Sequence, residues 1–186
     1  KIGQKVTATP QIVCGQCEPC KRGDYHICDT LKVEGFQAPG VAQDLFVTKA
    51  DKIVPLPDEF SFEQGAFVEP VSVAVHTVER IDSIEGKNVV VLGAGPIGNL
   101  VGQVAKARGG KVLITDISNY RLEIARKCGL EYTCNVSEKK LSDSVKEYFG
   151  DEGYNVAFEC VGIEDTMSET IETIGKGGSI VVVGVF

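Results

Sequence analysis

The sequence predicts an α/β protein in which a parallel, doubly wound sheet follows a smaller and irregular β region. Three observations carry this prediction. After Lys87, five short apolar runs alternate with four helical patterns. A glycine-rich turn at residues 93–98 joins the first run to the first helix. Before Lys87 the pattern is polar and broken, and a cluster of cysteines falls within residues 14–28.

Composition excludes several classes of function. The chain has 186 residues, of which 43% are hydrophobic, and a formal net charge of −7. An acidic chain without a basic stripe does not favour nucleic acid as a partner. No apolar run approaches the roughly 20 residues of a membrane span, and the first ten residues lack the apolar core of a signal peptide. We therefore expect neither a membrane nor a nucleic-acid partner.

The first region is expected to contain short strands and then a helix. Residues 5–9 alternate apolar and polar positions, which predicts a half-buried strand. Residues 45–48 and 52–56 show two further strand patterns. From residue 61 the pattern becomes helical, and Pro70 fits the first turn of a helix.

The second region is expected to be the sheet. We place the first domain at residues 1–72 and the second at residues 73–186. The unbroken apolar run at residues 88–93 predicts a strand that is buried on both faces, and the alternation of strand and helical patterns after it predicts a parallel sheet. The predicted strands are residues 88–93, 111–115, 131–135, 154–160 and 178–186, and the predicted helices are residues 96–110, 119–129, 138–150 and 164–175.

Four of the seven cysteines have metal-ligand spacing, C-x2-C-x2-C-x7-C. Four thiolates suit a closed tetrahedral zinc site with no position for a substrate. The loop is too polar to bury a core, so we interpret the zinc as structural. An iron–sulfur cluster or unligated thiols are the alternatives, although bacterial ferredoxins use x2, x2, x3 spacing. The predicted ligands are Cys14, Cys17, Cys20 and Cys28, with His26 on the surface and Cys128, Cys134 and Cys160 as core residues.

The glycine turn has the form G-x-G-x-x-G, and it lies between a buried strand and a helix. In a dinucleotide-binding unit the first glycine permits the tight turn, the second lets a pyrophosphate approach the backbone, and the third lets helix and strand pack closely. The free N–H groups at the helix start hold phosphates. The predicted cofactor contacts here are Gly93, Gly95, Pro96, Ile97 and Gly98.

Asp116 follows the turn at the end of the second strand. Its carboxylate there can accept hydrogen bonds from both ribose hydroxyls, and it repels a 2′-phosphate, which favours NAD over NADP. The alternative is that Asp116 or Ser118 only caps the next helix. Arg121 either lies over the adenine side or is a solvated helix charge. FAD and S-adenosylmethionine proteins use the same kind of turn.

Together these motifs resemble one family, the zinc-dependent medium-chain dehydrogenases, in the branch of sorbitol (polyol) and threonine dehydrogenases. The segments that carry the resemblance are PQIVCGQCEPCKRGDYHIC, GAFVEPVSVAVH, VVVLGAGPIGNL, ITDISNYRLEIARKCG, FECVG and GGSIVVVG. The resemblance implies a partial GroES-like catalytic domain with a structural-zinc lobe, followed by a Rossmann NAD-binding domain that lacks its last strand. It also implies that Glu69 lies near a catalytic zinc, that Asp116 and Arg121 contact the adenosine ribose, and that Val161 and Gly184 run along the nicotinamide side.

One departure from the family pattern is large. The family holds its catalytic zinc with a cysteine in a G-x-C-x-x-D segment and with a His-Glu pair, and this sequence has neither. The sequence starts with Lys1, and its one methionine is Met167. We therefore expect an internal excerpt of a longer polypeptide, with the catalytic ligands before its start.

Three further residues have competing interpretations. Glu69 before Pro70 is either a zinc neighbour or only a helix-start residue. His76 shares a helix stripe with Val73 and Val75, so a buried or interface position is favoured over a catalytic one. Glu159, at a strand end, either approaches the cofactor or is solvated.

The resemblance implies an enzyme that oxidises a secondary alcohol or polyol with NAD and zinc. The alternative is a dinucleotide-binding module with a structural zinc and no turnover of its own, and we expect this for the 186 residues alone. The family commonly forms homodimers or homotetramers, and the cysteine usage suits a reducing cytoplasm.

Overall fold

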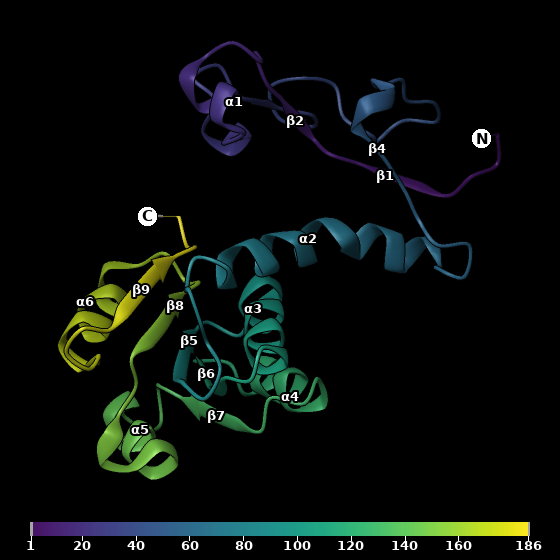
Figure 1. The fold of residues 1–186 in the computed structure, drawn as a ribbon. Helices are drawn as coiled ribbons and strands as arrows, with labels where there is room; N and C mark the ends of the chain where they lie inside the picture. Colours follow the sequence, from purple (N-terminus) through teal and green to yellow (C-terminus); the bar gives the residue numbers. More distant parts are fainter. Residues whose placement is uncertain (1, 186) are drawn as a thin grey trace. The chain divides into compact units, whose positions relative to one another are not determined.

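The computed structural model describes residues 2–185, and the chain divides into two compact units, Lys1–Glu69 and Pro70–Phe186 (Figure 1). The division falls inside one helix, α2 (Phe62–Val78). The domain boundary between residues 72 and 73 stays a prediction.

The first unit contains two small antiparallel strand pairs. Strand β1 (Val6–Ala8) pairs with β4 (Ile53–Pro55), as the patterns at residues 5–9 and 52–56 predict. Strand β2 (Gln11–Ile12) pairs with β3 (Lys32–Val33), and between them lies the cysteine loop with helix α1 (Glu18–Arg22). The 3₁₀ helices of this unit are Tyr25–Ile27 and Ala50–Lys52.

The strand predicted at residues 45–48 is wrong. Leu45 lies in a bend, residues 46–48 have no regular secondary structure, and the segment makes no ladder with another strand of the described residues. Leu45 and Val47 are 86% and 93% exposed. An alternating pattern forms a strand only where a neighbouring strand offers backbone hydrogen-bond partners. No strand of the described chain pairs with this segment.

Helix α2 is continuous, so the expected helix start at Pro70 is also wrong. Pro70 lies inside the helix, where it removes one backbone N–H from the hydrogen-bond ladder. No helix among residues 2–185 is both long enough and apolar enough to cross a bilayer.

The second unit is a five-stranded parallel sheet with the order β7-β6-β5-β8-β9 (Figure 1). Every neighbouring pair is parallel, so each connection must cross over through a helix. The predicted fold class, an α/β doubly wound sheet, is confirmed. The strands are β5 (Asn88–Leu92), β6 (Lys111–Asp116), β7 (Tyr132–Asn135), β8 (Val156–Glu159) and β9 (Ser179–Val182).

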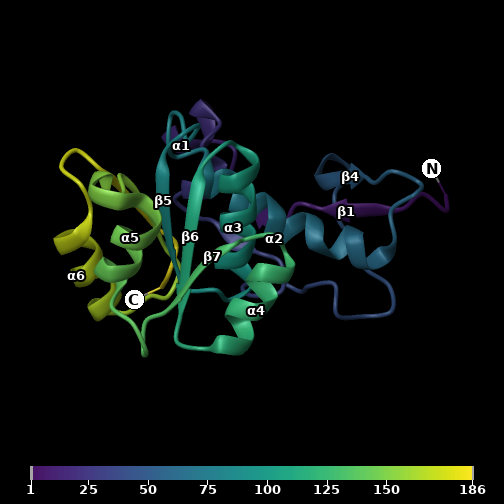
Figure 2. The same ribbon diagram turned by 90° about the horizontal axis from the view of Figure 1, so that it is seen from below.

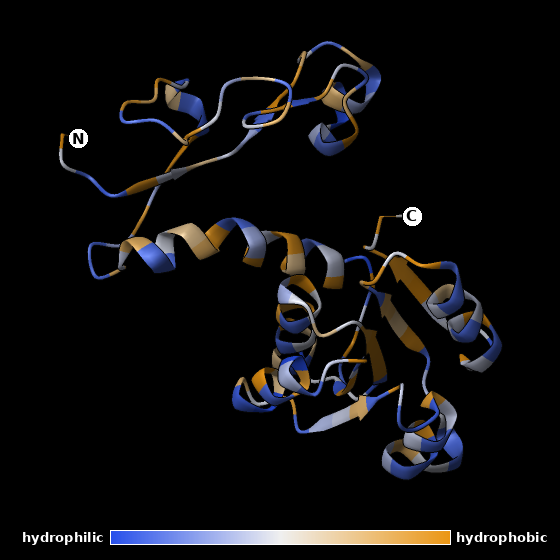
Figure 3. Ribbon diagram, turned by 180° about the vertical axis from the view of Figure 1, so that it is seen from behind, coloured by the Kyte–Doolittle hydropathy of each residue, from blue (hydrophilic) through white to orange (hydrophobic). Residues whose placement is uncertain are grey.

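Two apolar clusters cover the two faces of the sheet. Val89 and Val91 point to one cluster, together with Ala74 and Val78 of α2. Val90, one residue along, points to the other. Helices α3 and α4 lie on one side and α5 and α6 on the other (Figure 2), and the strands between them are mostly hydrophobic, apart from the edge strand β7 (Figure 3). These helices are α3 (Pro96–Ala107), α4 (Asn119–Lys127), α5 (Leu141–Phe149) and α6 (Glu164–Thr173).

The order of the strands positions the candidate site. The chain runs from β5 outward to β6 and β7, and then returns to the other side of β5 for β8 and β9. The connections therefore diverge at the carboxyl ends of β5 and its neighbours. In open parallel sheets such a point leaves a crevice for a ligand.

Candidate cofactor site and metal centre

Four cysteine side chains of the first unit gather at one point. Cys14 follows β2, Cys17 precedes α1, Cys20 lies in α1, and Cys28 follows a 3₁₀ turn. Their sulfur atoms all lie within 4.8 Å of one another, and Cys20 and Cys28 are buried. The structure thus brings together all four predicted ligands.

Backbone hydrogen bonds shape this loop around the sulfur atoms. The N–H of Cys17 donates to Cys14 Sγ at 3.3 Å, and the N–H of Cys14 donates to Cys28 Sγ at 3.4 Å. Gly23 ends α1 at φ 87°, a left-handed conformation, and its N–H donates to the Cys20 carbonyl at 3.1 Å. This reversal returns the chain so that Cys28 reaches the other three cysteines.

The donor set fits a tetrahedral zinc ion. Zinc–thiolate bonds of about 2.3 Å place sulfur atoms about 3.8 Å apart, and Cys14 Sγ lies 4.0 Å from Cys20 Sγ. Backbone donors from Gln16 and Cys17 lower the pKa of Cys14 to about 6, whereas burial raises the pKa of Cys20 to about 12. His26 is exposed and outside the group, as expected for a surface residue.

The glycine turn of the second unit connects β5 to α3. Gly93 has φ 92°, which is unfavourable for residues with a side chain. Around Gly95 there is open space, because a Cβ built there would meet no atom within 4 Å. A Cβ on Gly98 would collide with the Gly93 carbonyl oxygen. The three glycines therefore serve a tight turn, an open surface and a close contact.

Asp116 is bound to the glycine turn. Its Oδ2 accepts a hydrogen bond from the Ala94 N–H at 2.8 Å, and its Oδ1 accepts one from the Ser118 N–H at 2.8 Å. Ser118, not Asp116, caps α4, because its side chain accepts from the Arg121 N–H. Arg121 Nη1 lies 3.5 Å from Asp116 Oδ2, and the Asp116 side chain is only 4% exposed.

A cavity of about 250 Å³ opens where these elements meet. Among the predicted cofactor contacts, Gly93, Gly95, Asp116, Arg121 and Val161 line it. Pro96, Ile97, Gly98 and Gly184, all within the described chain, are not among its lining residues. Val161 therefore shares one cavity with the acid that was predicted to hold the adenosine ribose.

Several lining residues have no motif of their own. They share a position instead, because they lie at or just beyond the carboxyl ends of β6, β7 and β8. Strand ends read from the sequence would have found them, since ligands of open parallel sheets bind there. These residues are Thr115, Ile117, Val136, Cys160, Ile163 and Thr166.

Two family models divide most of the chain between them. Residues 1–58 match the alcohol dehydrogenase GroES-like domain, and residues 96–186 match the zinc-binding dehydrogenase domain. The chain belongs to the zinc-dependent medium-chain dehydrogenases. The resemblance seen in the sequence motifs is confirmed.

Relatives of this chain carry several substrate names. It is 36% identical over 186 residues to L-threonine 3-dehydrogenase of Idiomarina loihiensis, covering 100% of this chain and 54% of that protein. It is 32% identical over 189 residues to sorbitol dehydrogenase of Bacillus subtilis, covering 99% of this chain and 53% of that protein. The chain thus spans about half the length of these relatives.

Solved dehydrogenase structures share the fold and hold cofactors of both kinds. A protein from Sinorhizobium meliloti 1021, assigned as a zinc-binding dehydrogenase, is bound to NADP. It matches this chain with a TM-score of 0.93 and 26% identity, and the match covers 99% of this chain and 55% of that protein. An alcohol dehydrogenase from E. coli CFT073, described as short-chain, is in complex with NADH; it has a TM-score of 0.92 and 27% identity, over 100% of this chain and 55% of its own.

The structure places two other candidate residues on α2. Glu69 is exposed and lies inside the helix rather than at its start, and its role near a zinc ion stays a prediction. His76 is exposed, so a buried position is wrong; its Nε2 lies 2.8 Å from Arg80 Nη2. The buried side of this part of α2 carries Ala74 and Val78, one turn apart, and His76 points away from it.

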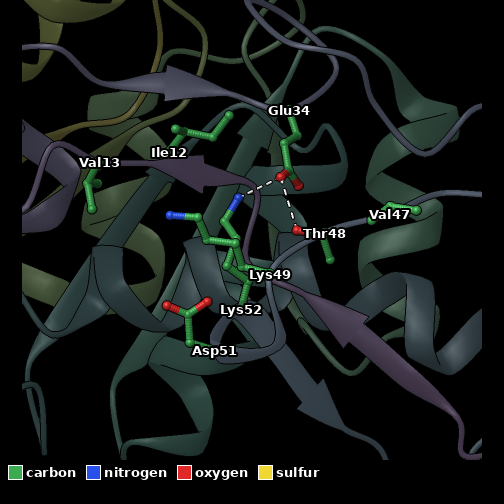
Figure 4. A pocket seen from close by; sticks show the side chains of 8 residues that line it. All are labelled: Ile12, Val13, Glu34, Val47, Thr48, Lys49, Asp51 and Lys52. Carbon is green, nitrogen blue, oxygen red and sulfur yellow. Dashed lines mark hydrogen bonds and ion pairs between the residues drawn. The ribbon is translucent and has the colours of Figure 1, made fainter.

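A second cavity lies within the first unit (Figure 4). Its volume is about 440 Å³, and three of its polar side chains interact with one another. Glu34 Oε1 accepts from Lys52 Nζ at 2.6 Å and from Thr48 Oγ1 at 3.2 Å. These side chains are largely buried, at 13% and 12% exposure for Lys52 and Glu34. We interpret this ion pair as a structural element of the unit.

The three cysteines outside the lobe differ in environment. Cys134 is buried and Cys160 is partly buried, whereas Cys128 is exposed at the end of α4, so its expected core position is wrong. Burial, followed by the charge of Glu159, raises the pKa of Cys160 to about 12. A thiol with a raised pKa carries almost no reactive thiolate near neutral pH.

We expect a thiol reagent at pH 8 to modify Cys128 quickly and Cys160 slowly, because Cys160 stays protonated well above that pH. Peptide mapping by mass spectrometry after short reaction times measures both rates. Cys128→Ser should remove the fast phase and leave the slow one unchanged. Equal rates for the two cysteines would contradict this assignment.

Proposed function

We propose that this chain binds NAD in the cavity beside Asp116 and holds one structural zinc ion in its cysteine lobe. The carrying observation is the position of Asp116, whose carboxylate joins the glycine turn and lines the cavity at the end of β6. The complete enzyme would oxidise a secondary alcohol or polyol. Support for this comes from the family and from relatives named for threonine and sorbitol.

The preference for NAD follows from charge. A carboxylate at a strand end accepts hydrogen bonds from two ribose hydroxyls, and each oxygen has further lone pairs beyond those used by Ala94 and Ser118. A 2′-phosphate at the same place would bring two negative groups together. Arg121 lies beside Asp116 and partly offsets this repulsion. We therefore expect a clear but finite preference for NAD.

The remaining residues of the cavity orient the dinucleotide. The open backbone at Gly95 leaves room for the pyrophosphate, and the amino end of α3 attracts its negative charge. Ile117, Val161 and Ile163 offer exposed apolar surface to the base. Once bound, NAD would supply the chemistry by accepting a hydride from the carbinol carbon of the substrate.

The zinc in the lobe would have a structural role. Four thiolate ligands complete its tetrahedral shell and leave no position for a substrate oxygen. Among residues 2–185 these cysteines form the one group of three or more possible ligands at metal distance. The second candidate function therefore concerns the chain alone: dinucleotide binding without turnover. Production of NADH from sorbitol or threonine by the 186 residues would contradict it.

Asp116→Asn tests the proposed NAD site. The substitution keeps the size and one acceptor oxygen but removes the charge, so we expect NAD binding to weaken about tenfold or more and NADP binding to change little. Titration calorimetry with both cofactors measures the ratio of their affinities. This ratio is independent of a general loss of stability.

Asp143→Asn is the matched control, because Asp143 is an exposed aspartate in the first turn of α5. It should leave both affinities unchanged. Absence of binding of either cofactor to the unmodified chain would contradict the proposed function. Tighter binding of NADP than of NAD would reverse the assigned preference.

Other properties of the complete enzyme follow as proposals. The substrate would be a small-molecule alcohol or polyol, and the assembly would be a homodimer or homotetramer. The seven free cysteines fit a reducing compartment such as the cytoplasm.

A further inference from the structure

Glu159, the last residue of β8, is fully buried, with 0% of its surface exposed. The solvated position considered from the sequence is therefore wrong. A buried carboxylate is strongly unfavourable unless hydrogen-bond donors surround it. Its partners consequently show what the residue does.

All the hydrogen-bond partners found for the Glu159 carboxylate are donors. The N–H groups of Val161 and Gly162 donate to Oε1 at 3.0 Å each, and the Gly162 N–H also approaches Oε2 at 3.1 Å. The hydroxyl of Thr166 lies 2.8 Å from Oε1, and it shares its proton with the Ile163 carbonyl. An ionised carboxylate only accepts, so this arrangement suits the charged form.

The same carboxylate lies against the end of the next strand. A Cβ on Gly184 would lie 2.6 Å from Glu159 Oε2 and would also collide with the Gly162 N–H. A Cβ on Gly162 would lie 2.8 Å from the Val185 nitrogen. Glu159 and these glycines therefore fix the segment after β8 against the segment after β9. This contact explains Gly184, which does not line the cavity.

The segment that Glu159 holds forms one wall of the nucleotide cavity. Cys160, Val161, Ile163 and Thr166 line that wall, and Asp116 lies among the other lining residues. Val161 and Ile163 are 42% and 48% exposed although they are large and apolar. Glu159 itself is not among the lining residues, so it acts on the cavity only through the residues it holds.

The part of the nucleotide that contacts this wall can be inferred from the apolar character of the wall. Asp116 is proposed to take the ribose hydroxyls, and the base is the apolar, flat group attached to that ribose. Val161 and Ile163, together with Ile117, offer the apolar surface that such a base needs. The resemblance implied the nicotinamide side for Val161; because Val161 lines the same cavity as Asp116, this inference assigns it to the adenosine side instead.

We infer that Glu159 is a positioning residue for base recognition: its buried carboxylate holds the loop of residues 160–163 in the shape that contacts the adenine ring. This inference rests on the proposed function, because it presumes a nucleotide in the cavity. Preorganisation of a loop raises affinity because less ordering remains to be done on binding.

Glu159→Gln tests the inference in the full 186-residue chain, with AMP as the probe. The substitution keeps the shape and one acceptor oxygen in the place of Oε1, but it removes the charge and turns the amide NH₂ toward the Gly162 N–H, which lies 3.1 Å from Oε2. Two donors then face each other, which loosens the loop. We expect AMP to bind about tenfold more weakly by calorimetry. Bound 1,N6-etheno-AMP should become accessible to acrylamide quenching, a spectroscopic change that loss of overall stability does not produce.

Two further variants make the result specific. Thr166→Val removes one donor and keeps the side-chain shape, so it should weaken AMP binding about two- to threefold. If Glu159→Gln does not fold, AMP binding by Thr166→Val tests the inference instead. Glu164→Gln makes the same chemical change on an exposed residue of α6 and should leave affinity and quenching as in the unmodified chain.

The outcomes separate the inference from the proposed function. Weaker AMP binding with an exposed etheno-adenine supports the inference. Unchanged AMP binding in Glu159→Gln, or in Thr166→Val where the first variant does not fold, overturns the inference alone. An equal loss of AMP and ribose 5-phosphate binding also overturns it, because the whole site is then distorted. Failure of the unmodified chain to bind AMP overturns the proposed function as well.

Discussion

Cys20→Ser should abolish stoichiometric zinc binding and unfold the cysteine lobe, while the sheet of the second unit stays folded. Between residues 14 and 30 the buried side chains are those of Cys20 and Cys28, so the lobe has no apolar core to replace the metal. Structural zinc contributes about 10–16 kcal/mol of apparent binding free energy in small zinc-dependent domains, and such domains are unfolded without it.

Elemental analysis and thiol titration measure this result. The unmodified chain should contain about one zinc ion, and removal of the metal should expose the lobe thiols to reagent. Cys128→Ser is the matched control, because it replaces an exposed cysteine outside the lobe and should leave the zinc content unchanged. Full zinc content in Cys20→Ser, or none in freshly purified unmodified chain, would contradict the metal site.

Two alanine substitutions in the glycine turn should have opposite effects. Gly98→Ala forces a Cβ onto the Gly93 carbonyl, a backbone atom that cannot move aside freely, so we expect a loss of about 2–4 kcal/mol in the free energy of unfolding. Gly95→Ala meets no atom within 4 Å, and its φ of −65° suits alanine. This variant should keep its stability but bind NAD at least about tenfold more weakly, because the methyl group occupies the pyrophosphate position.

Each glycine variant is the control for the other. Thermal unfolding measures the first effect, and calorimetry with NAD measures the second. An equal loss of stability in both variants would show that the surface at Gly95 is not open. Unchanged NAD affinity in Gly95→Ala would place the pyrophosphate elsewhere.

The second unit could be predicted closely from sequence because its signals are local. Most of its strands are short apolar runs and its helices have their own periodicity, so the order of the elements also predicts the parallel sheet. The cysteine cluster was equally local, since short spacing alone brings the four sulfur atoms together.

Other features depend on contacts between distant residues, and the sequence could not show them. Residues 45–48 have a strand pattern, but no strand of the described chain pairs with them. Pro70 lies inside a helix, although it was expected to lie at the start of one. Glu159 can be buried because hydrogen-bond donors of residues 161–166 surround its carboxylate. The spacing of apolar residues in the sequence does not predict these hydrogen bonds. Asp116 was found because a motif fixes its distance from the glycine turn.

The zinc lobe also bears on how freely its sequence can diverge. Where a core of packed side chains holds a fold, most positions restrict one another, and a change at one site requires changes at others. In this lobe the buried side chains are those of two of the cysteines that are proposed to bind zinc, so the stability of the lobe would depend on the four cysteines and the turn between them. The remaining positions can exchange charge and shape without disturbing the fold, and the surface of the lobe is free to acquire contacts that differ between related enzymes.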